Sequence, residues 1–170
     1  MQSAATMPST TYSSASSPAR PRYVDQECPL TLREGLEQFT AMMPNPLPTD
    51  TTTEVGKLLR AHDCCHVLFG LTTQLGDEIL ADTWTLAGTD LTLREYAKWL
   101  KQDEFAELFK EIGYGKIVLE SVKSLPRVVR AIARGRRMSQ KWSMFGYQEH
   151  LDTPLCELRR RYNIAVLPPL

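Results

Sequence analysis

The chain has 170 residues, in which twenty basic and twenty acidic side chains cancel, so its overall charge does not indicate a nucleic-acid partner. It is long enough for one domain with a sizeable core, and no apolar run approaches the roughly 18 residues of a membrane-spanning helix. Its four cysteines lack the paired spacing of a disulfide framework, which favours a reducing compartment: Cys28, Cys64, Cys65 and Cys156.

Residues 1–24 are rich in serine, threonine and proline and carry almost no large aliphatic side chains. Such a segment cannot bury enough apolar surface to offset its ordering entropy. The sequence therefore predicts a disordered tail, followed by a helical domain over residues 25–170. With Arg20 and Arg22 and no acid, the tail shares its composition with organelle transit peptides, although its prolines would break the amphipathic helix of such peptides.

The first two predicted helices are separated by a proline-rich segment. Thr31 and Glu34 have the spacing of a capping box, and an apolar stripe at helical spacing follows them. The segment PNPLPTD at 44–50 ends this helix. A second helix begins at Thr52 or Thr53 and ends at a turn led by glycine. Its inward stripe consists of Val55, Leu58, Leu59, His62, His66 and Phe69.

The middle of the chain predicts three more helices. One is expected over residues 76–87, with Gly88 as its stop. Thr92 and Glu95 form another capping box, which opens the next helix. A short helix over residues 105–112 follows and ends at a glycine.

The last third of the chain continues the helical pattern. A long helix is expected from about residue 116 to 136, where Pro126 kinks it or splits it in two. Thr153 is expected to cap a final helix, with Pro154 at its first position and Asn163 as its stop. No segment alternates with period two, so the predicted fold class is all-α: a single compact domain of six to eight helices.

The stretch HDCCH at 62–66 is the first candidate functional feature. In a helix, His62 and His66 lie one turn apart on the same inward face, and Asp63 borders it. Buried imidazoles need partners, and a divalent ion would take both ring nitrogens; the alternative is that they are polar residues satisfied within the core. The spacing is similar to the H-E-x-x-H helix of zinc proteases, whose acid is a general base, so Asp63 is the candidate catalytic residue.

Glu78 is a weaker candidate from the pattern alone. It opens the third predicted helix, and the turn before it could bring it over the histidines. An acid at this place is also favoured by the positive end of the helix, and the same holds for Asp77. Cys64 and Cys65 are interpreted as small core or helix-surface residues and not as soft metal ligands.

His62, Asp63, His66 and Glu78 fit the pattern H-D-x-x-H-x11-E, which resembles the signature of the coenzyme Q (ubiquinone) biosynthesis protein 4 family. The flanking HVLFG resembles the family's continuation after the second histidine. ARGRRM at 133–138 and YQEHLDTPLCELRRRYNI at 147–164 resemble its GRR segment and its closing helix, so the likeness covers residues 30–164 in order.

Three features depart from the family pattern. The large N-terminal helical region of mitochondrial members has no counterpart, and the predicted tail stands in its place. The glycine of the family's Leu-Gly-Glu comes one place early, at Gly76, which makes Asp77 a competitor of Glu78. Residues 83–88, TWTLAG, replace the phenylalanine and Ala-Gln that usually follow the glutamate.

The resemblance implies one divalent metal ion held by His62, Asp63, His66 and Glu78: zinc first, with iron, manganese, cobalt or magnesium as alternatives. It implies a role in ubiquinone biosynthesis, in which the C1 carboxyl of a polyprenylated benzoate-type ring is replaced by a hydroxyl in an oxidative decarboxylation. Other ubiquinone-biosynthesis enzymes would be partners. The expected location is cytoplasmic and peripheral to the inner membrane, or the matrix side of the mitochondrial inner membrane in a eukaryote, with a homodimer as an option.

A polyprenyl substrate requires contact with a membrane or a lipid carrier, and one predicted helix carries a basic face. This face consists of Lys123, Arg127, Arg130, Arg134 and Arg137, with aliphatic residues on the other side. Such a helix is typical of proteins that lie on anionic membranes; the alternative is a solvated outer face. Nucleic acid is not expected as a ligand, because aromatic side chains do not interleave with the arginines.

The large aromatic side chains are expected in the core, where some of them could line a prenyl channel: Trp84, Trp99, Phe105, Phe109 and Tyr114. Two functions other than the ubiquinone pathway remain open. One is a lipid-binding or scaffolding module with a structural metal site. The other is a small metallohydrolase, which H-D-x-x-H alone would allow.

Overall fold

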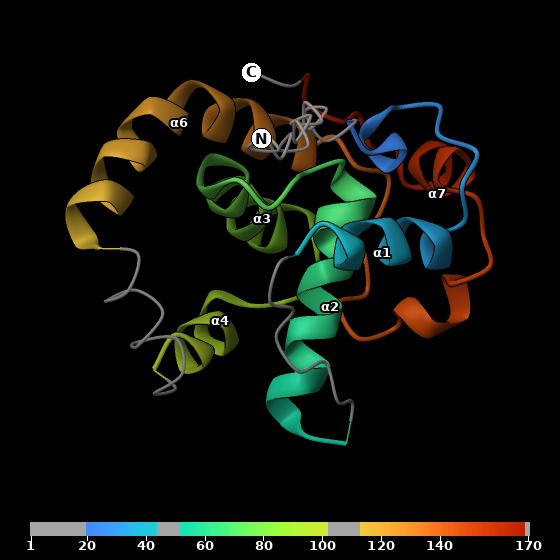
Figure 1. The fold of residues 1–170 in the computed structure, drawn as a ribbon, viewed down its shortest axis with the longest axis horizontal. Helices are drawn as coiled ribbons and strands as arrows, with labels where there is room; N and C mark the ends of the chain where they lie inside the picture. The colour runs from blue at the N-terminus through green and yellow to red at the C-terminus, as the bar shows by residue number, and fades with distance from the viewer. Residues whose placement is uncertain (1–19, 44–51, 102–112, 169–170) are drawn as a thin grey trace, which may run out of the picture.

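A computed structural model of the chain describes residues 20–43, 52–101 and 113–168 (Figure 1). These residues contain α-helices and 3-10 helices and no β-strand, so the predicted all-α class is confirmed. In chain order the elements are η1 (Arg22–Val24), α1 (Leu32–Ala41), α2 (Glu54–Phe69), α3 (Leu75–Gly88), α4 (Leu93–Trp99), α6 (Tyr114–Gly135), η2 (Tyr147–His150) and α7 (Leu155–Tyr162).

The predicted helix starts hold at three of the four capped helices. Thr31 and Thr92 each accept a hydrogen bond from the amide of a glutamate three residues on. The carboxylate of that glutamate accepts a hydrogen bond from the amide of the threonine. These are complete capping boxes, which satisfy two otherwise unpaired amides at each end. Thr53 caps α2 in the simpler way, through a bond from the amide of Gly56.

The last helix begins differently from the prediction. Pro154 is the N-cap of α7, in an extended conformation, and its carbonyl accepts the first bonds of the helix, so the expected cap at Thr153 is wrong. Asn163 stops the helix as predicted, in the left-handed conformation that asparagine tolerates. Helix α6 runs unbroken through Pro126, so this proline does not split it. The short helix expected over 105–112 lies outside the described residues.

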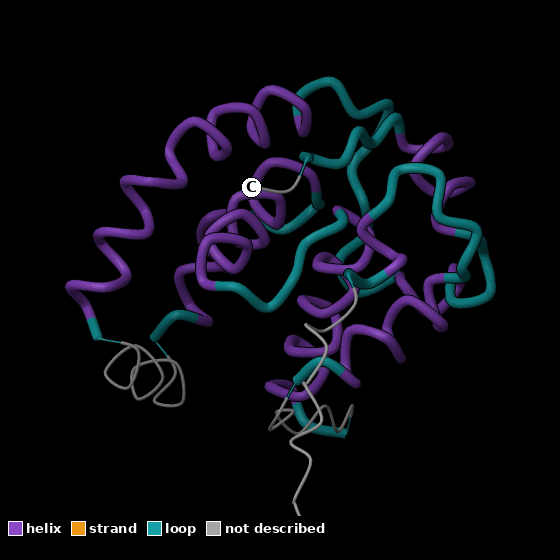
Figure 2. Tube along the Cα trace, turned by 45° about the horizontal axis from the view of Figure 1, so that its top comes forward, coloured by secondary structure: helices purple, strands orange, loops and turns teal. Residues whose placement is uncertain are grey.

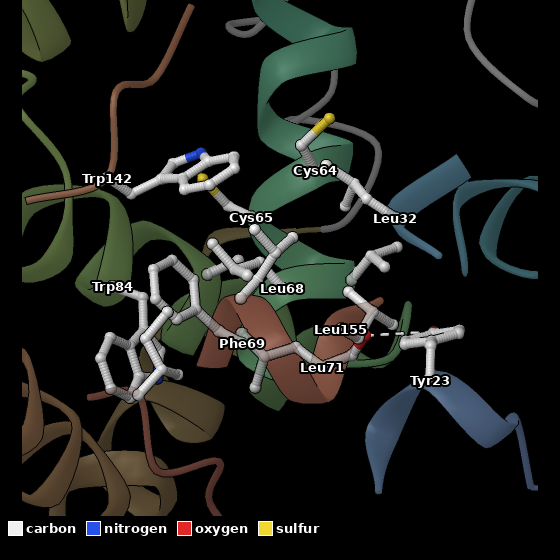
Figure 3. Close-up of a cluster of buried hydrophobic side chains, with 14 of the residues drawn as sticks. Tyr23, Leu32, Cys64, Cys65, Leu68, Phe69, Leu71, Trp84, Trp142 and Leu155 are labelled. Carbon is white, nitrogen blue, oxygen red and sulfur yellow. Dashed lines mark hydrogen bonds between the residues drawn. The ribbon is translucent and has the colours of Figure 1, made fainter. Parts of the chain in front are cut away.

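The folded part begins earlier than the sequence predicts. Tyr23 and Val24 of η1 are buried in the core, although residues 1–24 were expected to form the tail. The Tyr23 hydroxyl donates a hydrogen bond of 3.1 Å to the carbonyl of Leu71 (Figure 3). The buried ring and its satisfied hydroxyl help to anchor this short segment, and one aromatic residue hardly changes the average composition of residues 1–24. Residues 1–19 lie outside the described part of the chain.

Helix α2 is the centre of the domain, with α1, α3, α7 and η1 packed around it (Figure 1). Phe69 near its end stacks on Trp84 of α3, with ring centroids 4.4 Å apart. Figure 3 shows this core, which includes Tyr23, Leu32, Cys64, Cys65, Leu68, Phe69, Leu71, Trp84, Trp142 and Leu155. Cys64 and Cys65 are therefore small core residues, as interpreted from the sequence.

Of the aromatic residues expected inside, Trp84 is buried and Trp99 partly so, but Tyr114 is exposed; Phe105 and Phe109 lie outside the described residues.

A buried arginine joins α7 and the η1 segment to α2. Arg159 of α7 is fully buried, and its hydrogen bonds to described residues all go to main-chain carbonyls: those of Tyr23, Asp25, Gln26, Val67 and Leu68. Val67 and Leu68 belong to the last turn of α2, where carbonyls have no partner within the helix. A cation at this end also complements the helix dipole. Burial lowers the pKa of Arg159 to about 10, which leaves it charged at neutral pH.

Small residues let α6 pack closely on α3. A Cβ at Gly135 would lie 2.9 Å from both the Cβ and the carbonyl oxygen of Ala87, so only glycine fits this crossing. The face of α6 that carries Gly135 also carries Ala131, Arg127 and Ser124, and all of them are buried. Arg127 forms an ion pair with Asp77 at 2.8 Å. This pair therefore lies between α6 and the start of α3.

Breaking this ion pair should destabilise the fold clearly. Asp77 also accepts hydrogen bonds from the amide and hydroxyl of Thr72, so Asp77→Asn leaves a largely buried guanidinium without its charge partner. We expect the free energy of unfolding to fall by about 2–3 kcal/mol. Asp152→Asn is the matched control, since its ion pair with Arg33 is exposed and should contribute nothing measurable. Urea unfolding followed by circular dichroism compares the two; equal losses would contradict the prediction.

Candidate metal centre

Three polar side chains from two helices converge on one point. Nε2 of His62 and Nε2 of His66 lie 3.2 Å apart. Oε2 of Glu78 lies 3.2 Å from Nε2 of His66 and 3.5 Å from Nε2 of His62. Among the described residues, these three form the one group of histidine, cysteine and acidic side chains whose ligand atoms all lie within 4.8 Å of one another.

The local fold explains why Glu78 reaches the histidines. One helical turn separates His62 and His66, so their rings leave α2 on the same face. Gly70 then ends α2 in the left-handed conformation, with φ of 70°, and the chain reverses into α3. Glu78 lies in the first turn of α3 and points back towards α2.

The turn also separates the two acids that the sequence left in competition. Asp77 accepts from Thr72 and forms the ion pair with Arg127, so its two oxygens hold the turn before α3 and α6 together. Glu78, the next residue, leaves α3 about 100° further round the helix and contacts both imidazoles. The structure thus assigns Asp77 to the α3–α6 contact and brings only Glu78 to the histidines.

The spacing of the three atoms fits a divalent ion. Ligand atoms that lie about 2.0–2.1 Å from a tetrahedral zinc ion are about 3.3 Å from one another, close to the separations found here. Two imidazole nitrogens and a carboxylate oxygen also form a donor set that zinc, iron and manganese accept in proteins. Three protein ligands leave room for water or substrate at the ion. The residues present therefore fit a mononuclear metal site.

Without a cation the same arrangement is crowded with acceptors. A neutral imidazole carries one proton, so the contact between the two Nε2 atoms can hold one hydrogen at most. His66 is 1% exposed, and its Nδ1 has no hydrogen-bond partner among the described groups. Its ring is held by packing against Phe39 instead, with centroids 4.8 Å apart. Packing thus fixes the Nε2 of His66 towards the cluster.

The electrostatics of the cluster favour positive charge. Burial lowers the pKa of His62, but the hydrogen bond that its ring donates to Glu78 and the charges of the nearby carboxylates outweigh it and raise that pKa to about 8. Burial acts to raise the pKa of Glu78, and the two imidazoles overcome this and hold it well below its usual range. The cluster is surrounded by acidic groups that attract a cation.

Asp63, predicted as a ligand and as the catalytic residue, is not among the three converging side chains. It is buried on α2, directly after His62 and three residues before His66, and both of these histidines face the cluster. Burial raises the pKa of Asp63 to about 6, against the opposing effect of the histidines and Arg60. A catalytic role for Asp63 stays a prediction.

A further acid near the cluster was missed at the sequence level. Asp82 follows Glu78 by one turn of α3, and its charge acts on His62. Burial raises the pKa of Asp82, while His62 and a hydrogen bond with the hydroxyl of Tyr96 oppose this shift. The signal was present, because Glu78 and Asp82 have the same i, i+4 spacing as the two histidines.

The predicted basic face does not exist as one surface. Arg127 is buried in its ion pair with Asp77, and Arg134 donates to the carbonyls of Ala165 and Val166. Lys123 pairs with Glu120, while Arg130 and Arg137 are exposed. Helical spacing alone cannot tell an outward cation from one that satisfies a buried acid or carbonyl groups. The prediction of a single cationic face is therefore wrong.

A surface groove of about 440 Å³ lies elsewhere, between α3 and α6. Its described lining combines aliphatic side chains with a threonine and two cations: Thr83, Leu86, Ala87, Val128, Ile132, Arg136 and Lys141. Trp84, Trp99 and Tyr114, the described aromatic residues that were expected to line a prenyl channel, are not among them, and neither are the metal-site residues.

None of the described helices is both long enough and apolar enough to cross a bilayer. Compared with protein-family models, with curated proteins and with solved structures, the chain matches none of them.

Proposed function

We propose that the protein binds one divalent transition-metal ion through His62, His66 and Glu78, and that this ion serves its function. The observation that carries the proposal is the convergence of the three ligand atoms at 3.2–3.5 Å. Side chains from two helices meet there, on a scaffold set by the turn at Gly70. Zinc is the ion that this donor set suits first; iron, manganese and cobalt fit it less specifically, and magnesium least.

We further propose that the substrate is a polyprenylated benzoate-type ring and the reaction its C1 decarboxylation with hydroxylation, within ubiquinone biosynthesis. Support comes from the sequence pattern H-D-x-x-H-x11-E and from the open positions that three protein ligands leave at an ion. The ion, when bound, would supply Lewis acidity towards a ring carboxylate or water. The exchange is a two-electron oxidation, so the proposal includes dioxygen as the oxidant: water gives the hydroxyl, the carboxyl leaves as CO₂, and dioxygen takes the two electrons and becomes hydrogen peroxide. The negative charges of Asp63 and Asp82 act on His62 and favour its protonated form. On this proposal the other ubiquinone enzymes would be partners at a membrane surface.

A second candidate is a lipid-binding or scaffolding module with a structural metal site. One observation favours it: the three ligands join α2 to α3 and would fasten these helices without any chemistry. The two candidates differ in what metal loss does. In the enzyme, a variant that stays folded without metal loses turnover; in the module, metal loss removes stability and nothing else.

Metal content per chain is the deciding measurement. By plasma mass spectrometry, the purified protein should hold about one transition-metal ion, and His62→Ala, His66→Ala and Glu78→Gln should each lose it. Asp63→Asn is the control on the same helix and should keep the ion, because Asp63 is outside the converging group. Circular dichroism establishes that each variant is folded.

Each result has a defined meaning. A folded parent without metal contradicts the proposed site. Loss of metal in Asp63→Asn would mean that Asp63 completes a four-ligand set, as the family likeness implies. With metal bound, release of CO₂ from a polyprenylated 4-hydroxybenzoate, measured in air and under argon, tests the reaction. Metal without turnover would favour the structural candidate.

A further inference from the structure

Helix α6 exposes a line of apolar side chains to water. Its members lie at i, i+4, i+8, i+11 and i+15, so they form one face: Tyr114, Val118, Val122, Leu125 and Val129, here called the α6 ridge. Each of them is between 54% and 63% exposed. The ridge lies opposite the small and buried residues by which α6 packs on α3.

The exposure is concentrated on this one helix. Of the large hydrophobic residues exposed in the described part of the chain, most belong to α6, and Leu119 adds to one side of the ridge. Figures 1 and 2 show α6 along the outer edge of the molecule, with its first half extending beyond α3. Single exposed hydrophobic residues are ordinary, but a continuous row over four turns indicates a surface that meets something apolar.

The charges beside the ridge indicate what it meets. Residues 114–141 contain eight lysines and arginines and a single acid, Glu120, in a chain whose net charge is zero. Some of these cations have internal partners, as described for Arg127 and Arg134. Arg130, Arg136 and Arg137 are exposed, and Arg136 continues the line of the ridge beyond Val129. An apolar row that leads into exposed cations complements an anionic lipid surface.

We infer that the α6 ridge docks the protein onto an anionic membrane surface, with α6 lying in the plane of the interface. A second copy of the chain is a poorer occupant, because a contact between two α6 ridges would bring the cations of both copies together, and Glu120 is the one acid of residues 114–141 that could offset them. Crossing the bilayer is a different mode, and α6 lacks the apolar length for it. The inference uses no residue of the metal centre and does not depend on the proposed function.

Vesicle co-sedimentation of the full chain tests the docking. The probes are vesicles of phosphatidylcholine alone and of phosphatidylcholine mixed with phosphatidylglycerol. We expect binding to the mixed vesicles to be more than about tenfold tighter, since each cation near the surface adds attraction. Leu125→Gln should weaken that binding about tenfold by removing one inserted side chain. Leu93→Gln is the matched control, because Leu93 on α4 is also an exposed leucine, at 69% against 54% for Leu125.

Further variants and the results that would overturn the inference complete this test. Both substitutions are at exposed positions, so circular dichroism should find both variants folded; Val118→Gln with Val122→Gln provides a second ridge variant. The same loss in Leu125→Gln and Leu93→Gln, or no binding to mixed vesicles, would overturn the inference. A dimer in light scattering that dissociates in the ridge variants, with vesicle binding unchanged, would assign the ridge to a second copy. Glu78→Gln should bind vesicles like the parent, which separates this test from that of the metal site.

Discussion

Zinc at about a thousand times its dissociation constant should raise the free energy of unfolding by about 4 kcal/mol. The reason is that His62, His66 and Glu78 approach one another only when α2 and α3 are packed. Urea unfolding followed by circular dichroism, with zinc or with a chelator present, measures the difference. His66→Ala is the control, because zinc that binds cysteines of the unfolded chain affects this variant as well. An equal response of parent and variant to zinc would contradict a site in the folded protein.

The direction of the pH dependence should reverse when zinc is bound. In the metal-free protein the folded-state pKa of His62 is raised from 6.5 to about 8. The stabilisation from its contact with Glu78 is therefore complete below pH 6.5 and is lost as the pH rises through about 8. We expect a loss of about 1 kcal/mol, reduced by the partial exposure of Glu78. With zinc, stability should instead rise as the pH increases through about 6.5, the pKa of a histidine in the unfolded chain, because a ligating imidazole must be neutral.

His62→Gln distinguishes this effect from the titration of other groups. The variant should lose both the fall in metal-free stability above pH 6.5 and the rise in the presence of zinc. Parallel pH profiles of the parent with and without zinc would contradict the prediction.

Replacing Arg159 by methionine should be the most damaging single change in the core. The substitution keeps apolar volume but removes the donors that the carbonyls of Val67 and Leu68 receive at 2.9 Å. The buried carbonyls of Tyr23 and Leu68 are then left without a donor among the described groups, at about 1–3 kcal/mol each. The carbonyls of Asp25 and Val67 keep bonds from the amides of Cys28 and Gly70. We expect the free energy of unfolding to fall by about 3–5 kcal/mol.

Arg161→Met is the matched control for this prediction. Arg161 lies on the same helix, is exposed and pairs with Glu157, so its loss should be small. Urea unfolding by circular dichroism compares the two variants at one pH. If Arg159→Met lost no more stability than Arg161→Met, the hydrogen bonds to α2 would not hold the fold.

Local rules predicted the helices well, because capping and stopping depend on a few neighbouring residues. The capping boxes at Thr31 and Thr92 and the stop at Asn163 are examples. Spacing of four likewise placed His62 and His66 on one face. Glu78 is different, because its approach to them depends on the left-handed turn at Gly70, which helical periodicity does not contain.

Long-range pairing is where the sequence pattern failed. The arginines of α6 have the spacing of a basic face, yet Arg127 pairs with an acid fifty residues away. The residues that do face outward are the valines and leucines of the α6 ridge, which a simple rule of apolar burial assigns to the core. The same rule placed Tyr114 inside, and the extended position of α6 leaves it in water. Which face of an amphipathic helix is covered depends on its neighbours and not on its own sequence.

The position of Arg159 in the sequence determines when, during synthesis, the carbonyls at the end of α2 can receive their hydrogen bonds from it. The carbonyls that it binds at the end of α2 lie 91 and 92 residues earlier in the chain, and that of Tyr23 lies 136 residues earlier. Both histidines and Glu78 emerge from the ribosome long before this arginine does. The helix that carries the histidines therefore lacks this partner until α7 has been synthesised as well. A chain that stops short of α7 would contain every ligand of the metal centre and still lack the residue that secures their helix.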